Sequence, residues 1–406
     1  MAHSTTDTQD SGTKAAAFAV KAGGAPWYLW CGAIAITSAC TGMAWDIAWH
    51  RSIGRDAFWT APHITVYLCA VLATIMSGYL ILTATFGRST EGRSEEIRAV
   101  SVGVLGFRAP LGAFIAAWGG IAMLTSAPFD NWWHAAYGVD LKVESPPHAV
   151  AILGVFAIAL GVLYLILPAM NRAAPAKDKA ADANYKVLRR LFLYVGGLIV
   201  TLEMFFLLSY TWEGKLHSVS AYTDMALLIP LMAATLSWSS RHRWAATWAA
   251  AVYTTLRLAE LWILPLVPAQ PKLGPVYIPV THLIPAKFPV LVIVPAIALD
   301  ILWHRTRLWK PWKIALLSGI VFVAVLLAVE WPFASFLMTR HSENRFFGTM
   351  YFNYNMLPNN PDRLRIFVNP SHGLELVWGI LRAALYGAAG TWFGIRSGRQ
   401  LRRLQR

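Results

Sequence analysis

The sequence has little charge and very little cysteine, and each shortage excludes a class of protein. Of its 406 residues only 14% are charged, whereas 56% are hydrophobic, a balance too apolar for an ordinary soluble domain. The three cysteines, Cys31, Cys40 and Cys69, all lie in apolar stretches and form no C-x-x-C pair. The chain therefore shows no disulfide framework and no thiol motif for passing on metal ions.

Apolar runs of about 20 residues occupy most of the chain, and this is the length that a helix needs to cross a bilayer. We expect an all-α fold, a polytopic membrane helical bundle of about ten transmembrane helices. Four of these helices fall in residues 26–171, two in 172–244 and four in 245–406, with a polar outer loop at 340–372. The small, polar residues 1–25 are expected to form a disordered tail.

One motif occurs twice, with the pattern D-x-x-W-H-x3-G-x-D-x5/6-P-H. The first copy consists of Asp46, Trp49, His50, Gly54, Asp56, Pro62 and His63. The second copy consists of Asp130, Trp133, His134, Gly138, Asp140, Pro147 and His148. An internal repeat predicts two similar structural units. We therefore expect residues 26–87 and 108–171 each to form a helical hairpin, with the motif in the connecting loop.

The residue types and their spacing in the first copy are those of a metal site. Asp46 and His50 lie four residues apart and so share one face of a helix. A turn at Gly54 lets the chain return, and Pro62 suits the first turn of the next helix, which brings His63 back to the first two. One carboxylate and two imidazoles form a ligand set suited to copper, zinc or iron.

The second copy predicts the same ligand set from Asp130, His134 and His148. Asp56 and Asp140 are expected to orient a ligating imidazole by accepting a hydrogen bond from its other ring nitrogen. An alternative reading is that these residues only mark polar helix ends at the membrane interface. Two copies matched in seven positions favour metal binding over that alternative.

A net charge of +14 is compatible with binding to nucleic acid. The distribution of the basic residues along the chain instead predicts which loops lie on the cytoplasmic side of the membrane. With ten spans and the N-terminus inside, the inner loops carry most of the Lys and Arg, as the positive-inside rule requires. These basic loops would face anionic lipid, and no nucleic acid is expected. Both motifs then face the periplasm or exterior of a bacterial inner membrane.

Ionisable residues inside the expected spans need partners. Arg257 and Glu260, three residues apart, are expected to pair with each other. The remaining ones are compatible with a polar cavity, a proton route or helix–helix hydrogen bonds: Glu203, Asp224, Glu330, Glu375 and Arg382. Asp300 to His304 again reads D-x-x-W-H, but it lacks the rest of the pattern and is expected on the inner side, so we treat it as a coincidence or a decayed copy that binds no metal.

The ligand spacing resembles that of a known family. The D-x3-H-x12-H of Asp46, His50 and His63 is similar to the copper site in the C subunit of particulate methane and ammonia monooxygenases. That subunit has a neighbouring set with the pattern N-x3-H-x13-H, which the second copy matches with Asp130 in place of Asn. The resemblance covers about residues 26–170, and the four spans after Ala245 have no counterpart in it.

The resemblance implies bound copper, oxidation of a small substrate such as ammonia or a hydrocarbon, and partner subunits that include a soluble copper domain. The residues themselves predict two carboxylate–histidine sites in a helical bundle, for which zinc is also suitable. They leave three functions open: a monooxygenase-like subunit, a membrane protein for metal uptake or delivery, and a structural or assembly subunit. A homo-oligomer is compatible with each, and no catalytic residue is identified.

The two motif loops differ in charge. The first carries Arg51 and Arg55, whose positive charge favours an anionic ligand beside the first site. In the second loop Lys142 and Glu144 roughly cancel. This difference favours the first site as the one that activates oxygen.

Overall fold

The computed structural model describes nine stretches of the chain, and all structural statements below concern these residues. They are 25–54, 59–87, 92–137, 145–173, 179–211, 215–272, 280–285, 287–351 and 370–405. Most of the expected N-terminal tail, and residues 352–369 of the expected outer loop, lie outside them.

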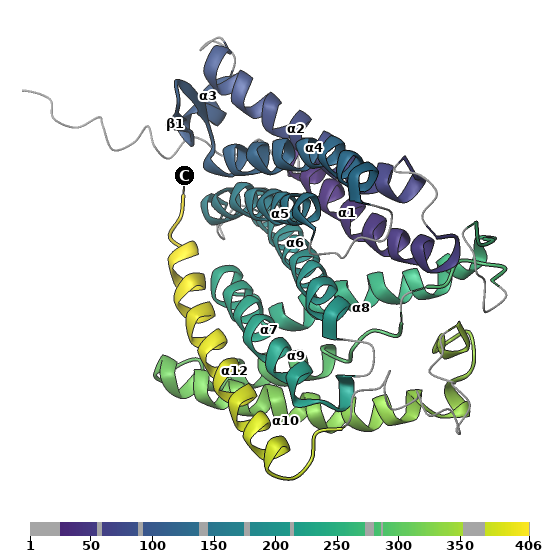
Figure 1. Cartoon of the computed structure of the whole chain (residues 1–406). Helices are drawn as coiled ribbons and strands as arrows, with labels where there is room; N and C mark the ends of the chain where they lie inside the picture. The colour runs from purple at the N-terminus through teal and green to yellow at the C-terminus, as the bar shows by residue number, and fades with distance from the viewer. Residues whose placement is uncertain are drawn as a thin grey trace, which may run out of the picture.

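Helices make up nearly all of the described structure (Figure 1), which confirms an all-α polytopic membrane bundle. The α-helices are α1 (Trp27–Ser52), α2 (Ala61–Phe86), α3 (Gly92–Ala99), α4 (Leu111–Tyr137), α5 (Pro146–Arg172), α6 (Lys179–Thr211), α7 (Val219–Ser240), α8 (Ala245–Ile263), α9 (Ile293–Thr306), α10 (Pro311–Leu337) and α12 (Gly373–Leu401). Short 3-10 helices are η2 (Lys215–His217), η3 (Leu264–Leu266), η4 (Arg340–Ser342) and η5 (Thr349–Tyr351). The strands β1 (Val102–Val104) and β2 (Phe107–Ala109) form a small antiparallel hairpin in which Gly103 is opposite Arg108.

Eight helices within the described residues are long and apolar enough to cross a membrane: α1, α2, α4, α5, α6, α7, α8 and α10. The two other spans that hydropathy predicts, near Leu283–Trp303 and Leu374–Ile395, correspond to α9 and α12. Helix α9 has only 14 residues, too few to cross the hydrocarbon core. Helix α12 has 29 residues, but it carries Glu375, Arg382, Arg396 and Arg399, which lower its hydropathy.

Proline explains why α9 is short. Pro285 and Pro289 have no backbone N–H and disfavour helix in the residues before them, and α9 begins only at Ile293. Inside a membrane protein, backbone N–H and C=O groups outside a helix need hydrogen-bond partners within the protein. The amide of Val290 donates to the Tyr253 hydroxyl at 3.2 Å, and the amide of Leu291 donates to Glu330 Oε2 at 2.8 Å.

Each copy of the repeat forms a helical hairpin, as the sequence predicts. Helices α1 and α2 pack as one pair, and α4 and α5 as the other. Both return helices begin at the predicted Pro-His step, α2 at Ala61 and α5 at Pro146. Thr60 caps α2 by accepting a hydrogen bond from the His63 amide at 3.4 Å, which fixes the start of the helix that carries this ligand.

Paired glycines let α4 and α5 approach closely. A Cβ atom on Gly112 would overlap the carbonyl oxygen of Gly161, and one on Gly119 would lie 2.6 Å from the carbonyl oxygen of Gly154. Both contacts are far below van der Waals distance, so only glycine fits. Small residues are the usual means by which membrane helices pack backbone against backbone.

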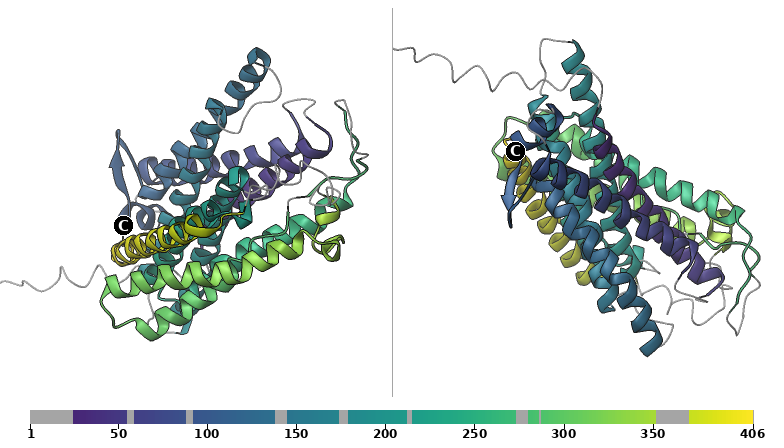
Figure 2. Two further views of the ribbon diagram at one scale, coloured as in Figure 1. Left: turned by 60° about the horizontal axis from the view of Figure 1, so that its bottom comes forward. Right: turned by 90° about the horizontal axis from the view of Figure 1, so that it is seen from above.

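Helix α6 joins the two hairpins to the rest of the bundle. It packs against α1 and α5 on one side and against α7 and α8 on the other. Helix α12 lies along α7 and α10. Figures 1 and 2 show the C-terminus and the β1–β2 hairpin at one end of the molecule and the last turns of α1 at the opposite end.

The membrane topology can be tested with two exposed glutamates at opposite ends. Glu343 follows α10 at the end where α1 finishes, and Glu96 lies in α3 at the other end. In a background without the three native cysteines, Glu343→Cys should react with a membrane-impermeant maleimide in intact cells. Glu96→Cys should react only after lysis, because basic loops stay inside. The reverse pattern would place the motif loops in the cytoplasm.

Candidate metal centre

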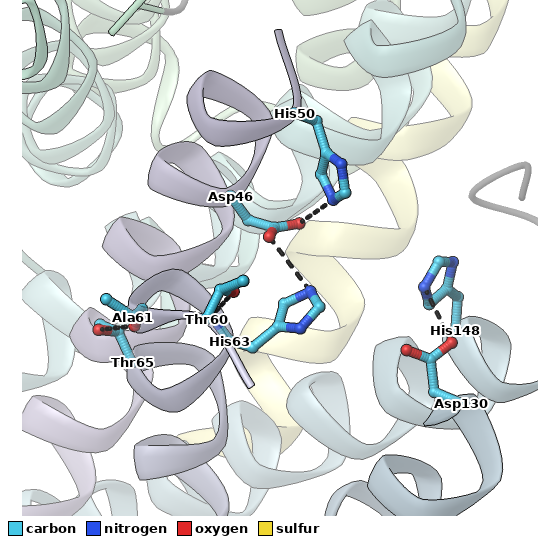
Figure 3. A network of polar contacts seen from close by, with 8 residues as sticks. All are labelled: Asp46, His50, Thr60, Ala61, His63, Thr65, Asp130 and His148. Carbon is cyan, nitrogen blue, oxygen red and sulfur yellow. Dashed lines mark hydrogen bonds and ion pairs between the residues drawn. The ribbon is translucent and has the colours of Figure 1, made fainter. Parts of the chain in front are cut away.

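The first ligand set converges in space, as its spacing predicts. Asp46 and His50 lie on the last turns of α1, and His63 lies on the first turn of α2. The Nε2 atom of His50 is 3.5 Å from Asp46 Oδ2, and the Nε2 atom of His63 is 3.2 Å from Asp46 Oδ1. Figure 3 shows the carboxylate between the two imidazoles.

The geometry of these three groups fits one metal ion. One potential ligand atom from each of Asp46, His50 and His63 lies within 4.8 Å of the other two. Two ligands of one ion, each at ~2.1 Å, are at most about 4.2 Å apart, so a contraction of about half an ångström would complete the site. Asp46 Oδ1 is buried and accepts no well-formed hydrogen bond. A cation at this point would satisfy that oxygen.

A proton-bridged cluster is the alternative that needs no metal. In that case one or both imidazoles donate from Nε2 to the Asp46 carboxylate, and the cluster becomes a polar helix end. The two states exclude each other at each nitrogen, because the lone pair that would bind a metal is occupied by the proton. Metal binding would therefore move that proton to Nδ1 or release it.

The second copy shows the same carboxylate–imidazole contact. Asp130 on α4 is buried, and its Oδ1 atom lies 3.3 Å from Nε2 of His148 on α5. This pair corresponds to Asp46 and His63 in the first copy. His134 lies within α4, but its side chain is outside the described residues. Asp56 and Asp140, which were expected to orient the imidazoles, also lie outside them.

Both copies face one cavity, which the sequence does not predict. The cavity has a volume of about 150 Å³, and its polar lining includes Asp46, His63, Asp130 and His148. Its apolar lining includes Met43, Ile47, Val66, Met123, Phe205 and Phe206. Figure 3 shows that the two carboxylate–histidine pairs come from neighbouring helix pairs. The repeat thus brings two similar polar pairs to a single, mostly apolar space.

Two walls of the cavity come from residues that no motif marks. Phe205 and Phe206 belong to α6, which is outside the repeat, and they lie in an ordinary apolar run. The hydroxyls of Tyr67 on α2 and Ser126 on α4 lie 3.3 Å apart and connect the two hairpins beside the cavity. No local sequence signal distinguishes these residues from the rest of the core.

Three other ionisable residues of the bundle, Arg257, Glu260 and Asp300, have structural contacts. Arg257 Nη1 is 2.6 Å from Glu260 Oε2, which confirms the predicted pair. The Asp300 carboxylate accepts hydrogen bonds from the amides of Ala246 and Thr247 in the first turn of α8. This D-x-x-W-H segment therefore caps a helix.

No protein-family model, curated protein sequence or solved structure matches the chain. The similarity to the copper monooxygenase subunit accordingly rests on the ligand spacing alone, and it stays a prediction. The metal centre has to be tested on the protein itself.

Removing His63 tests the first site. Removing the group that hydrogen-bonds to a metal ligand typically lowers metal affinity by about 10- to 100-fold, and removing the ligand itself costs more. We therefore expect His63→Ala, in a background that also carries His148→Ala, to weaken metal binding by more than about 100-fold. Metal content of the purified protein by mass spectrometry is the measurement. His341→Ala, which removes an exposed histidine at the same end, is the matched control. Equal metal content in the wild type, the His63→Ala/His148→Ala variant and the His341→Ala variant would mean that the cluster is proton-bridged and holds no metal.

Proposed function

We propose that the protein is a copper-binding, integral membrane subunit of a monooxygenase-like complex that oxidises a small substrate. The observation that carries this proposal is the convergence of Asp46, His50 and His63 at the edge of a mostly apolar cavity. The ligand spacing shared with the C subunit of copper membrane monooxygenases gives independent support.

In this proposal Asp46, His50 and His63 hold the metal and leave part of its coordination sphere open. Two imidazoles and a carboxylate accept copper, and they also accept zinc. Bound copper would supply one-electron redox chemistry and the activation of dioxygen. The carboxylate lowers the net charge of the site, so that a divalent ion is held with less residual charge in an apolar surrounding.

The cavity gives the site its selectivity. A volume of about 150 Å³ suits a small molecule better than a large one. Met43, Phe205 and Phe206 give the cavity an apolar lining, which favours a small or apolar substrate. The pair formed by Asp130 and His148 lies on the same cavity and can bind a second ion or move a proton.

Eight apolar helices within the described residues support an integral membrane location, and we assign the protein to a bacterial inner membrane. The end of α1, which carries Asp46 and His50, lies at the end of the bundle opposite the C-terminus. With the basic end in the cytoplasm, the cluster faces the periplasm. Electrons and a soluble copper domain would come from partner subunits.

Spectroscopy on the copper-loaded protein tests this function. We expect an electron paramagnetic resonance signal of Cu(II) with hyperfine coupling to imidazole nitrogen, which disappears on reduction and returns when dioxygen is admitted. His50→Ala should abolish the return of the signal from the first site, whereas His134→Ala should only slow it, because Asp46, His50 and His63 remain intact.

Three results would contradict the proposal. Purified protein that retains zinc and rejects copper would exclude redox chemistry at the cluster. A Cu(II) signal that survives in His50→Ala with unchanged coupling would move the metal elsewhere. Reoxidation at the wild-type rate in His50→Ala would remove oxygen activation from the first site.

A further inference from the structure

Five exposed arginines gather at the end of the bundle opposite the metal cluster. They are Arg241, Arg307, Arg399, Arg402 and Arg403. Helices α7, α9 and α12 all end there, at Ser240, Thr306 and Leu401.

Packing one turn earlier holds these three helix ends together. A Cβ atom on Gly398 of α12 would lie 2.7 Å from Cβ of Trp238 on α7, so the two backbones are in close contact. The indole ring of Trp238 also packs edge-on against Trp303 of α9, with ring centroids 5.2 Å apart. Trp238 therefore contacts both other helices.

The positions of three of the arginines follow from these contacts. Arg402 comes four residues after Gly398, Arg307 four residues after Trp303, and Arg241 three residues after Trp238. Each thus lies about one helical turn beyond a packed residue. The packing of the helices therefore brings the three guanidinium groups to one place.

Within the described residues, no acidic group neutralises the positive charge of this cluster. None of the five arginines forms an ion pair within the described part of the chain. Partial burial, together with the charges of Arg241, Arg307, Arg403 and Arg399, lowers the pKa of Arg402. The three helix C-termini contribute only about −0.5 charge each, which leaves a large positive excess.

The backbone that carries the cluster is held in place by neighbouring helices. The Asn171 side chain, at the end of α5, donates to the carbonyls of Leu401 at 3.1 Å and Leu404 at 2.7 Å. The Tyr185 hydroxyl, at the start of α6, donates to the Ser240 carbonyl at 3.4 Å. The arginines are therefore presented from a fixed frame.

Exposed apolar residues next to the cluster indicate where it lies. Leu308 is 100% exposed, Trp309 is 49% exposed and Trp312 is 55% exposed. Lys313 packs over the Trp312 ring at 5.6 Å. Exposed Leu and Trp beside Lys and Arg are typical of the membrane–water interface. An anion that meets these arginines is thus expected to be attached to apolar chains.

We propose that Arg241, Arg307 and Arg402, assisted by Arg399 and Arg403, bind the phosphate of an anionic phospholipid headgroup. Guanidinium groups bind phosphate oxygens through paired, charge-assisted hydrogen bonds. The acyl chains would lie against Leu308 and Trp309. The bound lipid links the ends of α7, α9 and α12, so it stabilises the half of the bundle that has no counterpart in the repeat.

Thermal unfolding in mixed micelles tests this site. Phosphatidylglycerol should raise the Tm of the wild-type protein, whereas phosphatidylcholine and an equal concentration of inorganic phosphate should not. The double variant Arg241→Gln/Arg402→Gln should need at least about tenfold more phosphatidylglycerol for the same rise, since each arginine near anionic lipid contributes appreciably to binding.

Arg340→Gln/Arg345→Gln is the matched control, because it removes two exposed arginines at the opposite end. Its response to phosphatidylglycerol should equal that of the wild type. The proposal fails if the Arg241→Gln/Arg402→Gln variant responds like the wild type, or if both double variants lose the response equally. It also fails if inorganic phosphate raises the Tm as much as the lipid does, since the ligand would then be a free anion.

Discussion

The contact between Asp46 and two imidazoles is the interaction on which the account of this molecule depends. A carboxylate inside an apolar helical bundle is costly unless a cation or hydrogen-bond donors compensate it. The Nε2 atoms of His50 and His63 lie 3.5 and 3.2 Å from the Asp46 carboxylate oxygens. They compensate its charge either through a shared proton or by holding a metal ion beside it. The C-terminal end of α1 and the N-terminal end of α2 are therefore held together where the chain leaves the bundle.

The internal repeat turns this local requirement into a larger arrangement. The contact between Asp130 and His148, at 3.3 Å, reproduces that between Asp46 and His63 on a second hairpin. Gly112 on α4 and Gly161 on α5 let the two helices of the second hairpin pack closely. The carboxylate–histidine pairs of both hairpins line one cavity. At the opposite end the exposed arginines form no ion pair within the described residues, and on the proposal above a lipid phosphate is their partner.

Much of this arrangement is readable from the sequence because it depends on local spacing. Asp46 and His50 are one helical turn apart, and a Pro-His step at the start of a helix returns His63. The cavity is not readable, since Phe206 comes from α6, far along the chain and in an unremarkable apolar run. Helix α9 was expected to be a full span because hydropathy counts apolar residues, whereas Pro289 decides where helix can form.

The most direct test of the central claim is the position of copper in the folded protein. Crystals or particles of copper-loaded protein, measured by anomalous scattering or elemental mapping at the copper edge, should show an ion ~2.0–2.2 Å from Asp46, His50 and His63. Copper bound stoichiometrically at any other place, with Asp46 still in direct contact with both imidazoles, would contradict the account.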